Sequence, residues 1–274
     1  MGIKMKPMCL TQLDEGLPLA GKALLRYSLA FSAYIRGWLR RTEVLRMIVN
    51  PRTVAISLLL VGVVGCTTAP AVAQRSARFR RADTSDAYGR TYYIDGAGNW
   101  GYGVHEVTEG LRRAGYRGRV INWRWSPTLN PALDQTVGRP FARKRGQELG
   151  RDITEYLRQY PNNEVNIIAL SAGTGVAIWA CESLEPPAKV HNLVLLGSSL
   201  SSDYDVSKAL ANITGEIHVY HSKGDQILRG PVRALGTIDG KLGVEPAGLV
   251  GLHPPTGSER IRNIPWSRRY ERYG

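Results

Sequence analysis

The chain has 274 residues, of which 43% are hydrophobic and 22% are charged, and its formal net charge is +13. This length and apolar content suffice for one large or two small globular domains. The basic residues are mostly Arg and are scattered along the chain without a recognition motif, which argues against a nucleic-acid partner. The three cysteines, Cys9, Cys66 and Cys181, lie far apart, and no H-E-x-x-H cluster is present. We therefore expect neither a disulfide framework nor a metal site.

The N-terminal region contains an apolar run, residues 54–65, that ends directly before Cys66. A helix of this length is too short to cross a bilayer, but it suits the hydrophobic part of a signal peptide. The ending Val-Val-Gly-Cys resembles the lipobox of bacterial lipoproteins. This resemblance implies that residues 47–65 are a lipoprotein signal peptide, cut before Cys66, and that the Cys66 thiol carries a lipid. A buried strand with a free thiol is the alternative.

The same resemblance implies a membrane-anchored lipoprotein of a bacterial cell envelope, on its periplasmic or extracellular face. Met47 begins a segment with the length of a complete signal, so residues 1–46 are interpreted as an N-terminal extension or a mis-assigned start. Residues 66–87 are small, polar and basic without periodicity, which is typical of a flexible tether. Residues 88–274 are then left as one folded domain.

Strand-like and helix-like segments alternate from Tyr88 onward. The apolar patterns and turn residues predict strands at 90–95, 117–125, 164–170, 190–199 and 216–222, and helices at 103–115, 142–161, 173–184 and 205–212. Strands that alternate with helices form a parallel sheet covered on both sides. The fold class is therefore predicted as α/β, a doubly wound and mostly parallel sheet of about six strands with helices on both faces.

The most apolar predicted strand leads into "ALSAGTG", residues 169–175, and Ser171 falls between this strand and a helix of small residues. The pattern resembles the nucleophile elbow G-x-S-x-G of the α/β-hydrolases, with Ala169 in place of the first glycine. The turn is so tight that only small residues fit two positions on either side of the serine. The resemblance implies a compact α/β-hydrolase in which Ser171 is the nucleophile. A serine that caps the helix is the alternative.

The segment "GAGNWG", residues 96–101, has the spacing G-x-G-x-x-G, which occurs in dinucleotide-binding proteins. Such a site also needs an acidic residue at the end of the next strand, and "NWRWSP" offers none. In the α/β-hydrolases, the loop at this place lends a backbone N–H to the oxyanion hole. The resemblance therefore implies that Ala97 or Gly98, together with Ala172, stabilises an oxyanion, and that no cofactor is used. A nucleotide-dependent reductase is kept as a lesser alternative.

A hydrolase triad also needs an acid and then a histidine after the nucleophile in the chain. Asp225 follows the strand predicted at 216–222 and is the preferred acid, with Asp203 and Asp205 as rivals after the preceding strand. His253 is the one histidine that follows Asp225, so chain order selects it. The stretch before it is rich in glycine and a poor strand, and relatives carry a histidine in a loop that follows a Tyr-Gly pair. Either His253 is the base, or the chain lacks one.

The function expected from these residues is that of a serine hydrolase that cleaves carboxylic esters through an acyl-enzyme on Ser171. The short connection between the strands predicted at 190–199 and 216–222 leaves no room for a cap domain, which favours an accessible site. The expected partners are a small-molecule or lipid ester as substrate and a membrane, reached through the lipid anchor. The alternative from another class is a catalytically inactive envelope protein that keeps the hydrolase fold without a competent histidine.

Overall fold

The structure is a computed structural model, and it describes residues 84–101, 103–128 and 130–268. The predicted extension, signal peptide and lipidation site, Cys66, lie outside the described residues, as does most of the predicted tether. Within the described ranges, no helix is both long and apolar enough to cross a membrane.

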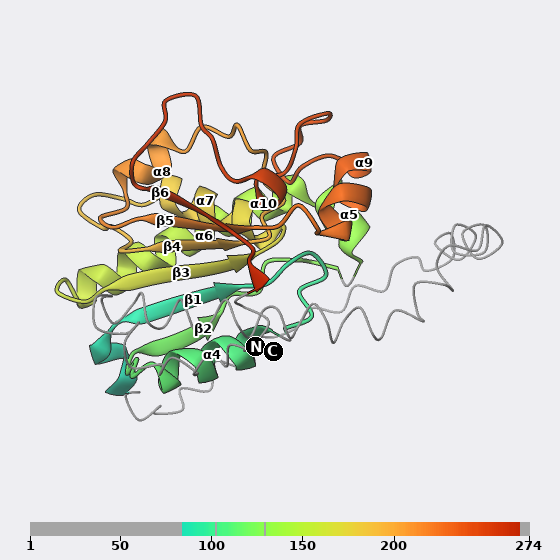
Figure 1. The fold of residues 1–274 in the computed structure, drawn as a ribbon. Helices are drawn as coiled ribbons and strands as arrows, with labels where there is room; N and C mark the ends of the chain where they lie inside the picture. The colour runs from blue at the N-terminus through green and yellow to red at the C-terminus, as the bar shows by residue number, and fades with distance from the viewer. Residues whose placement is uncertain (1–83, 102, 129, 269–274) are drawn as a thin grey trace, which may run out of the picture.

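Six parallel strands form one sheet in the order β2-β1-β3-β4-β5-β6 (Figure 1). The strands are β1 (Arg90–Ile94), β2 (Arg119–Asn122), β3 (Val165–Leu170), β4 (Leu193–Leu196), β5 (Ile217–His221) and β6 (Ile261–Pro265). The predicted α/β class with a parallel sheet is confirmed. Because all strands run the same way, their carboxyl ends meet at one edge, beyond which α5 (Pro131–Gln135), α9 (Arg233–Leu235) and α10 (Ala247–Val250) lie (Figure 1).

Helices cover both faces of the sheet (Figure 1). The face covered by α4 (Gly103–Arg113) buries Ile168 and Val194 of the central strands against Val107 and Leu111 of that helix. The other face packs on α6 (Arg139–Gln159), α7 (Gly173–Glu182) and α8 (Ser207–Ala211). Strands buried on both faces must be apolar throughout, as the completely buried segment Leu193–Leu196 illustrates.

Strand β6 and helices α5 and α10 are among the elements that the sequence did not predict. Strand β6 is half-exposed at the sheet edge and carries a charge and a proline, so its apolar pattern is weak. Helix α5 lies in a proline-containing stretch interpreted as a loop, and it begins at Pro131 after the capping side chain of Asn130. Helix α10 lies in the glycine-rich stretch before His253. All three are short, and segments this short give little periodicity.

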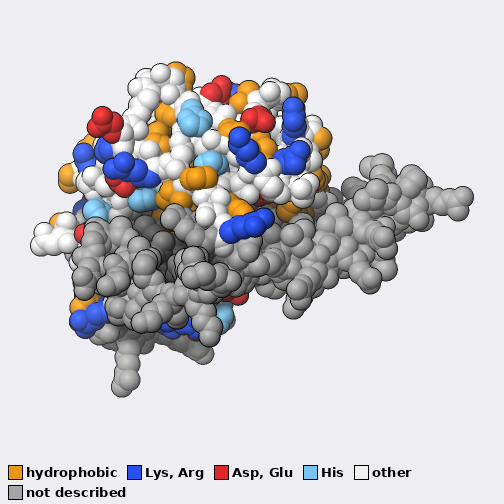
Figure 2. Space-filling view, viewed as in Figure 1, with side chains coloured by type: hydrophobic (Ala, Val, Ile, Leu, Met, Phe, Trp, Pro, Cys, Tyr) orange, Lys and Arg blue, Asp and Glu red, His pale blue; other side chains and the backbone are white. Residues whose placement is uncertain are grey.

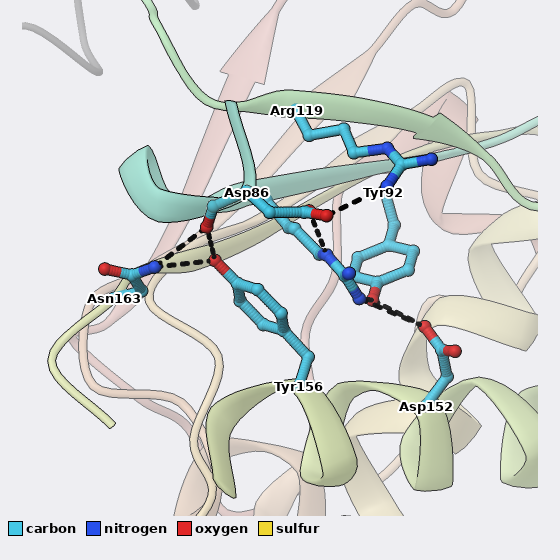
Figure 3. A network of polar contacts seen from close by, with 7 residues as sticks. Asp86, Tyr92, Arg119, Asp152, Tyr156 and Asn163 are labelled. Carbon is cyan, nitrogen blue, oxygen red and sulfur yellow. Dashed lines mark hydrogen bonds and ion pairs between the residues drawn. The ribbon is translucent and has the colours of Figure 1, made fainter. Parts of the chain in front are cut away.

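A polar network fixes the first turn of the described chain, the 3₁₀ helix η3 (Thr84–Tyr88), to the sheet and to α6 (Figure 3). The carboxylate of Asp86 accepts hydrogen bonds from Arg90 Nε at 2.6 Å and from Arg119 at 2.9 Å. The Tyr156 hydroxyl donates to the backbone oxygen of Asp86 at 2.7 Å. Arg90 and Arg119 open their strands, so this network lies at the amino edge of the sheet, opposite the edge where parallel strands carry ligand sites.

The surface is charged without forming a field of one sign on the side that Figure 2 shows. Lys and Arg side chains there are interspersed with Asp, Glu and His side chains and with apolar atoms (Figure 2). This mixture differs from the continuous basic stripe that tracks a nucleic-acid backbone.

Candidate active site

Ser171 occupies a strained turn between β3 and α7. Its φ is +49°, and among the described residues other than glycine only Asn99 shares a positive φ. The turn brings the start of α7 onto β1 so closely that a Cβ atom at Gly173 would lie 2.3 Å from the Asp95 carbonyl oxygen and 2.8 Å from that of Ile94. Glycine is therefore required at Gly173 by contact with the neighbouring strand. Ala169, two residues before the serine, is completely buried.

The Ser171 hydroxyl is available for chemistry in this turn. The backbone of Ser171 is fully engaged, because its N–H donates to Leu196 O at 2.9 Å and its carbonyl accepts from Thr174 N–H at 3.1 Å. The side chain is half-buried, and its Oγ makes no hydrogen bond to a described residue. Helix α7 has no side-chain cap at its N-terminus. Ser171 therefore does not serve as a helix cap.

Two amides next to Ser171 have no hydrogen-bond acceptor among the described residues, those of Ala97 and Ala172. Ala172 directly follows the serine. The loop that carries Ala97 approaches the serine from β1, because a Cβ atom at Gly96 would lie 3.2 Å from Ser171 Cβ. The Gly98 amide, the other predicted oxyanion donor on this loop, instead donates to Asp134 Oδ2 at 2.7 Å. The structure thus leaves Ala97, and not Gly98, free to bind an oxyanion.

Two buried carboxylates, Asp95 and Asp134, hold the glycine-rich loop, and sequence reasoning identified neither. Asp95 accepts from Gly96 N–H at 2.8 Å and from Gly101 N–H at 2.6 Å, which closes the loop on itself. Asp134 lies on α5 and is completely buried. The Asp-Gly pair at the start of the loop is a local turn signal that favours the Asp95 contacts. No local signal reveals Asp134, which is 36 residues from Gly98 in sequence.

The same hydrogen bonds bear on the dinucleotide alternative. A pyrophosphate binds to free N–H groups at a helix N-terminus or in a loop. Here the amides of Gly96, Gly98 and Gly101 already donate to carboxylates. Negative carboxylates at these amides would also repel a diphosphate. The loop therefore has the glycine spacing of a dinucleotide site without its anion-binding surface.

Asp225 follows β5, two strands away from β3 along the carboxyl edge of the sheet. Its Oδ1 accepts hydrogen bonds from the N–H groups of Ile227 and Leu228, both at 3.0 Å. Burial raises the pKa of the Asp225 carboxyl above its ordinary value, and these two hydrogen bonds oppose that rise.

The rival acids are occupied elsewhere on the surface. Asp203 forms an exposed ion pair with Lys241 Nζ at 2.8 Å, and Asp205 accepts from the Ser207 N–H at 2.9 Å. Asp225 also accepts backbone hydrogen bonds, but it is half-buried whereas Asp203 and Asp205 are exposed, so it remains the preferred acid.

His253 is not brought to Ser171 in this structure. Its ring is exposed, and its Nε2 lies 3.0 Å from the carbonyl oxygen of Val250 in its own loop. A Cβ atom at Gly251 would lie within 3.1 Å of His253 Nε2 and 2.8 Å of the Asn263 side chain, which places the ring beside β6. Asn263 is in register with Ala169 but three strands away, or about 14 Å at the usual strand spacing.

No described histidine forms a hydrogen bond with Ser171 or Asp225. His221, at the end of β5, is the histidine closest to Asp225 in the chain, and its Nδ1 lies 3.4 Å from Leu249 O. Burial lowers the pKa of His221. The described residues thus bring the Ser171 hydroxyl, two amides without an acceptor and the Asp225 carboxyl to one edge of the sheet, and no described histidine is hydrogen-bonded to any of them.

No protein-family model matches the chain, and no curated protein matches its sequence.

Proposed function

We propose that this protein is a serine hydrolase of the α/β-hydrolase type, which cleaves carboxylic esters through an acyl-enzyme on Ser171. One observation carries the proposal: Ser171 has a positive φ and an unbonded hydroxyl, beside two amides that have no other acceptor among the described residues. A serine held in this strained turn has no structural role that a glycine would not fill better. The position of the serine after β3, with parallel strands on both sides, agrees with this assignment.

In this mechanism Ser171 Oγ attacks the ester carbonyl and loses its proton to a base. The carbonyl oxygen becomes negative and is stabilised by the N–H groups of Ala97 and Ala172. Collapse of the tetrahedral intermediate expels the alcohol, which takes up the proton, and leaves an acyl group on Ser171. Water then attacks the acyl-enzyme and releases the acid. Asp225 would orient the base and stabilise its charged form.

His253 is the base that chain order selects, and its use requires a rearrangement of the loop that carries it. That loop is held by the His253 N–H, which donates to Ser202 O at 2.6 Å, and by Asn263, whose side chain bonds both backbone groups of Leu252. Breaking a few hydrogen bonds of this kind costs about 1 kcal/mol each. Leu252 is also buried, so this side chain must move with the loop in the rearrangement.

A second candidate is a non-catalytic protein that binds an ester or a similar ligand at this edge. The observation that favours it is the position of His253, far from Ser171 beside β6. The two candidates differ in one chemical property, because only the hydrolase makes Ser171 nucleophilic.

Apolar side chains at the edge support a substrate with an apolar group. Trp100 lies on the same loop as Ala97 and is 43% exposed, and Ile227, two residues after Asp225, is 39% exposed. Large apolar side chains exposed on loops of the carboxyl edge favour the burial of an acyl chain over that of a charged group.

The location proposed for this activity is a bacterial envelope membrane, through a lipid on Cys66. Support comes from the sequence, since Cys66 lies outside the described residues. Radiolabelled palmitate should enter the protein in a bacterial host and should be lost in Cys66→Ser. Equal labelling of both chains would remove the anchor from the proposal.

A fluorophosphonate probe tests the hydrolase against the binding protein. We expect the probe to label the full-length chain and label Ser171→Ala not at all, because the probe forms its bond with an activated serine. His253→Ala should reduce the labelling rate by at least about 100-fold if His253 is the base. An unlabelled wild-type chain that retains its fold by circular dichroism would contradict the hydrolase and leave the binding protein.

A further inference from the structure

The glycine-rich loop is held by a carboxylate on another element. Asp134 of α5 has no exposed surface, and both of its oxygens are used. Oδ2 accepts from Gly98 N–H at 2.7 Å and from Ser126 Oγ, and Oδ1 accepts from Thr128 Oγ1 at 2.7 Å. A buried carboxylate is costly unless it is hydrogen-bonded in this way.

We infer that Asp134 is a positioning residue, which aims the Ala97 amide at the reacting carbonyl by fixing the next amide of the loop. This inference rests on the proposed function. The hydrogen bonds of Asp134 run to Gly98, Ser126 and Thr128 and not to Ser171, so its carboxylate acts through the loop and not on the reacting atoms.

The geometry of the loop explains how a bond to the Gly98 amide can fix the direction of the Ala97 amide. The peptide between Gly96 and Ala97 is planar, so the direction of the Ala97 N–H is fixed once the Gly96 carbonyl is fixed. That carbonyl accepts a hydrogen bond from Asn99 N–H at 3.1 Å. The φ of +85° at Gly98 is open to glycine, but the φ of +45° at Asn99 is uncommon for other residues, so this turn benefits from a further restraint. The hydrogen bond from Gly98 to Asp134 supplies that restraint from outside the loop.

The charge of Asp134 would affect the reaction rate in the opposite direction to its positioning role. The charge of Asp134 repels a developing oxyanion, so removal of the carboxylate would speed the reaction if charge mattered more than position. Asparagine separates the two effects. Its oxygen can keep the bonds from Gly98 and Ser126, and its NH₂ can donate to Thr128 Oγ1, whose own hydrogen already has a second acceptor in Asn130 O at 3.2 Å.

The experiment measures the fluorophosphonate labelling rate and ester hydrolysis by the full-length chain and three variants. Asp134→Ala should lower the labelling rate and kcat by about 10- to 100-fold with little change in KM, because an oxyanion contact forms only in the transition state. Asp134→Asn should stay within about 3-fold of the wild type, since it keeps the Gly98 contact. Thr154→Ala is the control: Thr154 is buried on α6 outside this network, and its hydroxyl bonds Gly150 O and the Glu185 N–H, so its loss should lower stability but not the labelling rate.

The outcomes separate this inference from the proposed function. A wild-type chain that is not labelled overturns both. A labelled wild-type chain with Asp134→Ala at the wild-type rate overturns the positioning role alone, and faster labelling of both Asp134 variants assigns Asp134 an electrostatic effect instead. If Asp134→Ala lacks the native near-ultraviolet circular dichroism, Asp134→Ser is measured instead. A serine hydroxyl cannot bond Gly98 and Thr128 at the same time, so the same fall in labelling rate and kcat is expected.

Discussion

Ser171 combines a reactive side chain with an unfavourable backbone. Its φ of +49° brings Cβ too close to the backbone, at a cost of about 1–2 kcal/mol for a residue other than glycine. The cost persists because the neighbouring strand and helix fix the turn, through the bond to Leu196 and the contact of Gly173 with β1. Strain of this kind at a single polar residue is a common property of functional sites.

Replacement of Ser171 by glycine should therefore stabilise the protein while it abolishes the proposed chemistry. We expect the free energy of unfolding of Ser171→Gly to exceed that of Ser171→Ala by about 0.5–1 kcal/mol, because relief of strain outweighs the extra unfolded-state entropy of glycine. Chemical denaturation of both full-length variants measures this difference. Equal or lower stability of the glycine variant would mean that the turn is not strained.

The unit formed by β3, its sharp turn and α7 depends on close contact with β1. The N-terminus of α7 sits against the carbonyl oxygens of Ile94 and Asp95, where even one methyl group lacks space. Two helical glycines, Gly173 and Gly110, differ in the space around them. Gly173 is buried at this contact, whereas a Cβ atom at Gly110, inside α4, would meet nothing within 4 Å.

Alanine at these two positions should have opposite effects. Gly173→Ala should lower the free energy of unfolding by about 2 kcal/mol or more, because the helix must move away from the strand. Gly110→Ala should raise it by about 0.5–1 kcal/mol, since alanine favours a helix over glycine. Thermal and denaturant unfolding measure both values. A harmless Gly173→Ala change would show that α7 and β1 are not in close contact.

The two ends of the sheet have different tasks in the molecule as a whole. The carboxyl edge carries Ser171 and its neighbours, and the amino edge carries the network around Asp86 (Figure 3). That network joins η3 to β1, β2 and α6, so it holds the first described turn of the chain against the sheet. Hydrogen bonds and ion pairs from Arg90 and Arg119 lower the pKa of the Asp86 carboxyl, although burial opposes this.

The lowered pKa predicts how stability depends on pH. A carboxyl group whose pKa is lower in the folded state stabilises the fold above its unfolded pKa, which is about 3.9 for Asp. The stabilisation from Asp86 should thus be complete at neutral pH and disappear as the pH falls below about 4, through the folded pKa. Asp86→Asn should cost about 2 kcal/mol at pH 7 and progressively less in acid. A difference that does not change with pH would exclude the ionised Asp86 as its cause.

Much of the fold follows from local patterns in the chain. The alternation of apolar strands with amphipathic helices is a short-range property, and it was enough to predict five of the parallel strands. Strand β6 escaped prediction because edge position and partial exposure remove the apolar run on which such a prediction depends. The helices α5 and α10 escaped because one turn of helix has almost no periodicity.

The sharp turn at Ser171 was readable from the sequence because the small residues that it needs lie within two positions of the serine, although the contact that requires glycine at Gly173 is with β1. The sequence did not predict which partners the buried polar groups bind, because each of these hydrogen bonds joins segments that are distant in the chain. Only packing brings Asp134 to the Gly98 amide and so leaves the Ala97 amide free. Packing also places His253 beside β6 and away from Ser171, although chain order alone suggested their pairing.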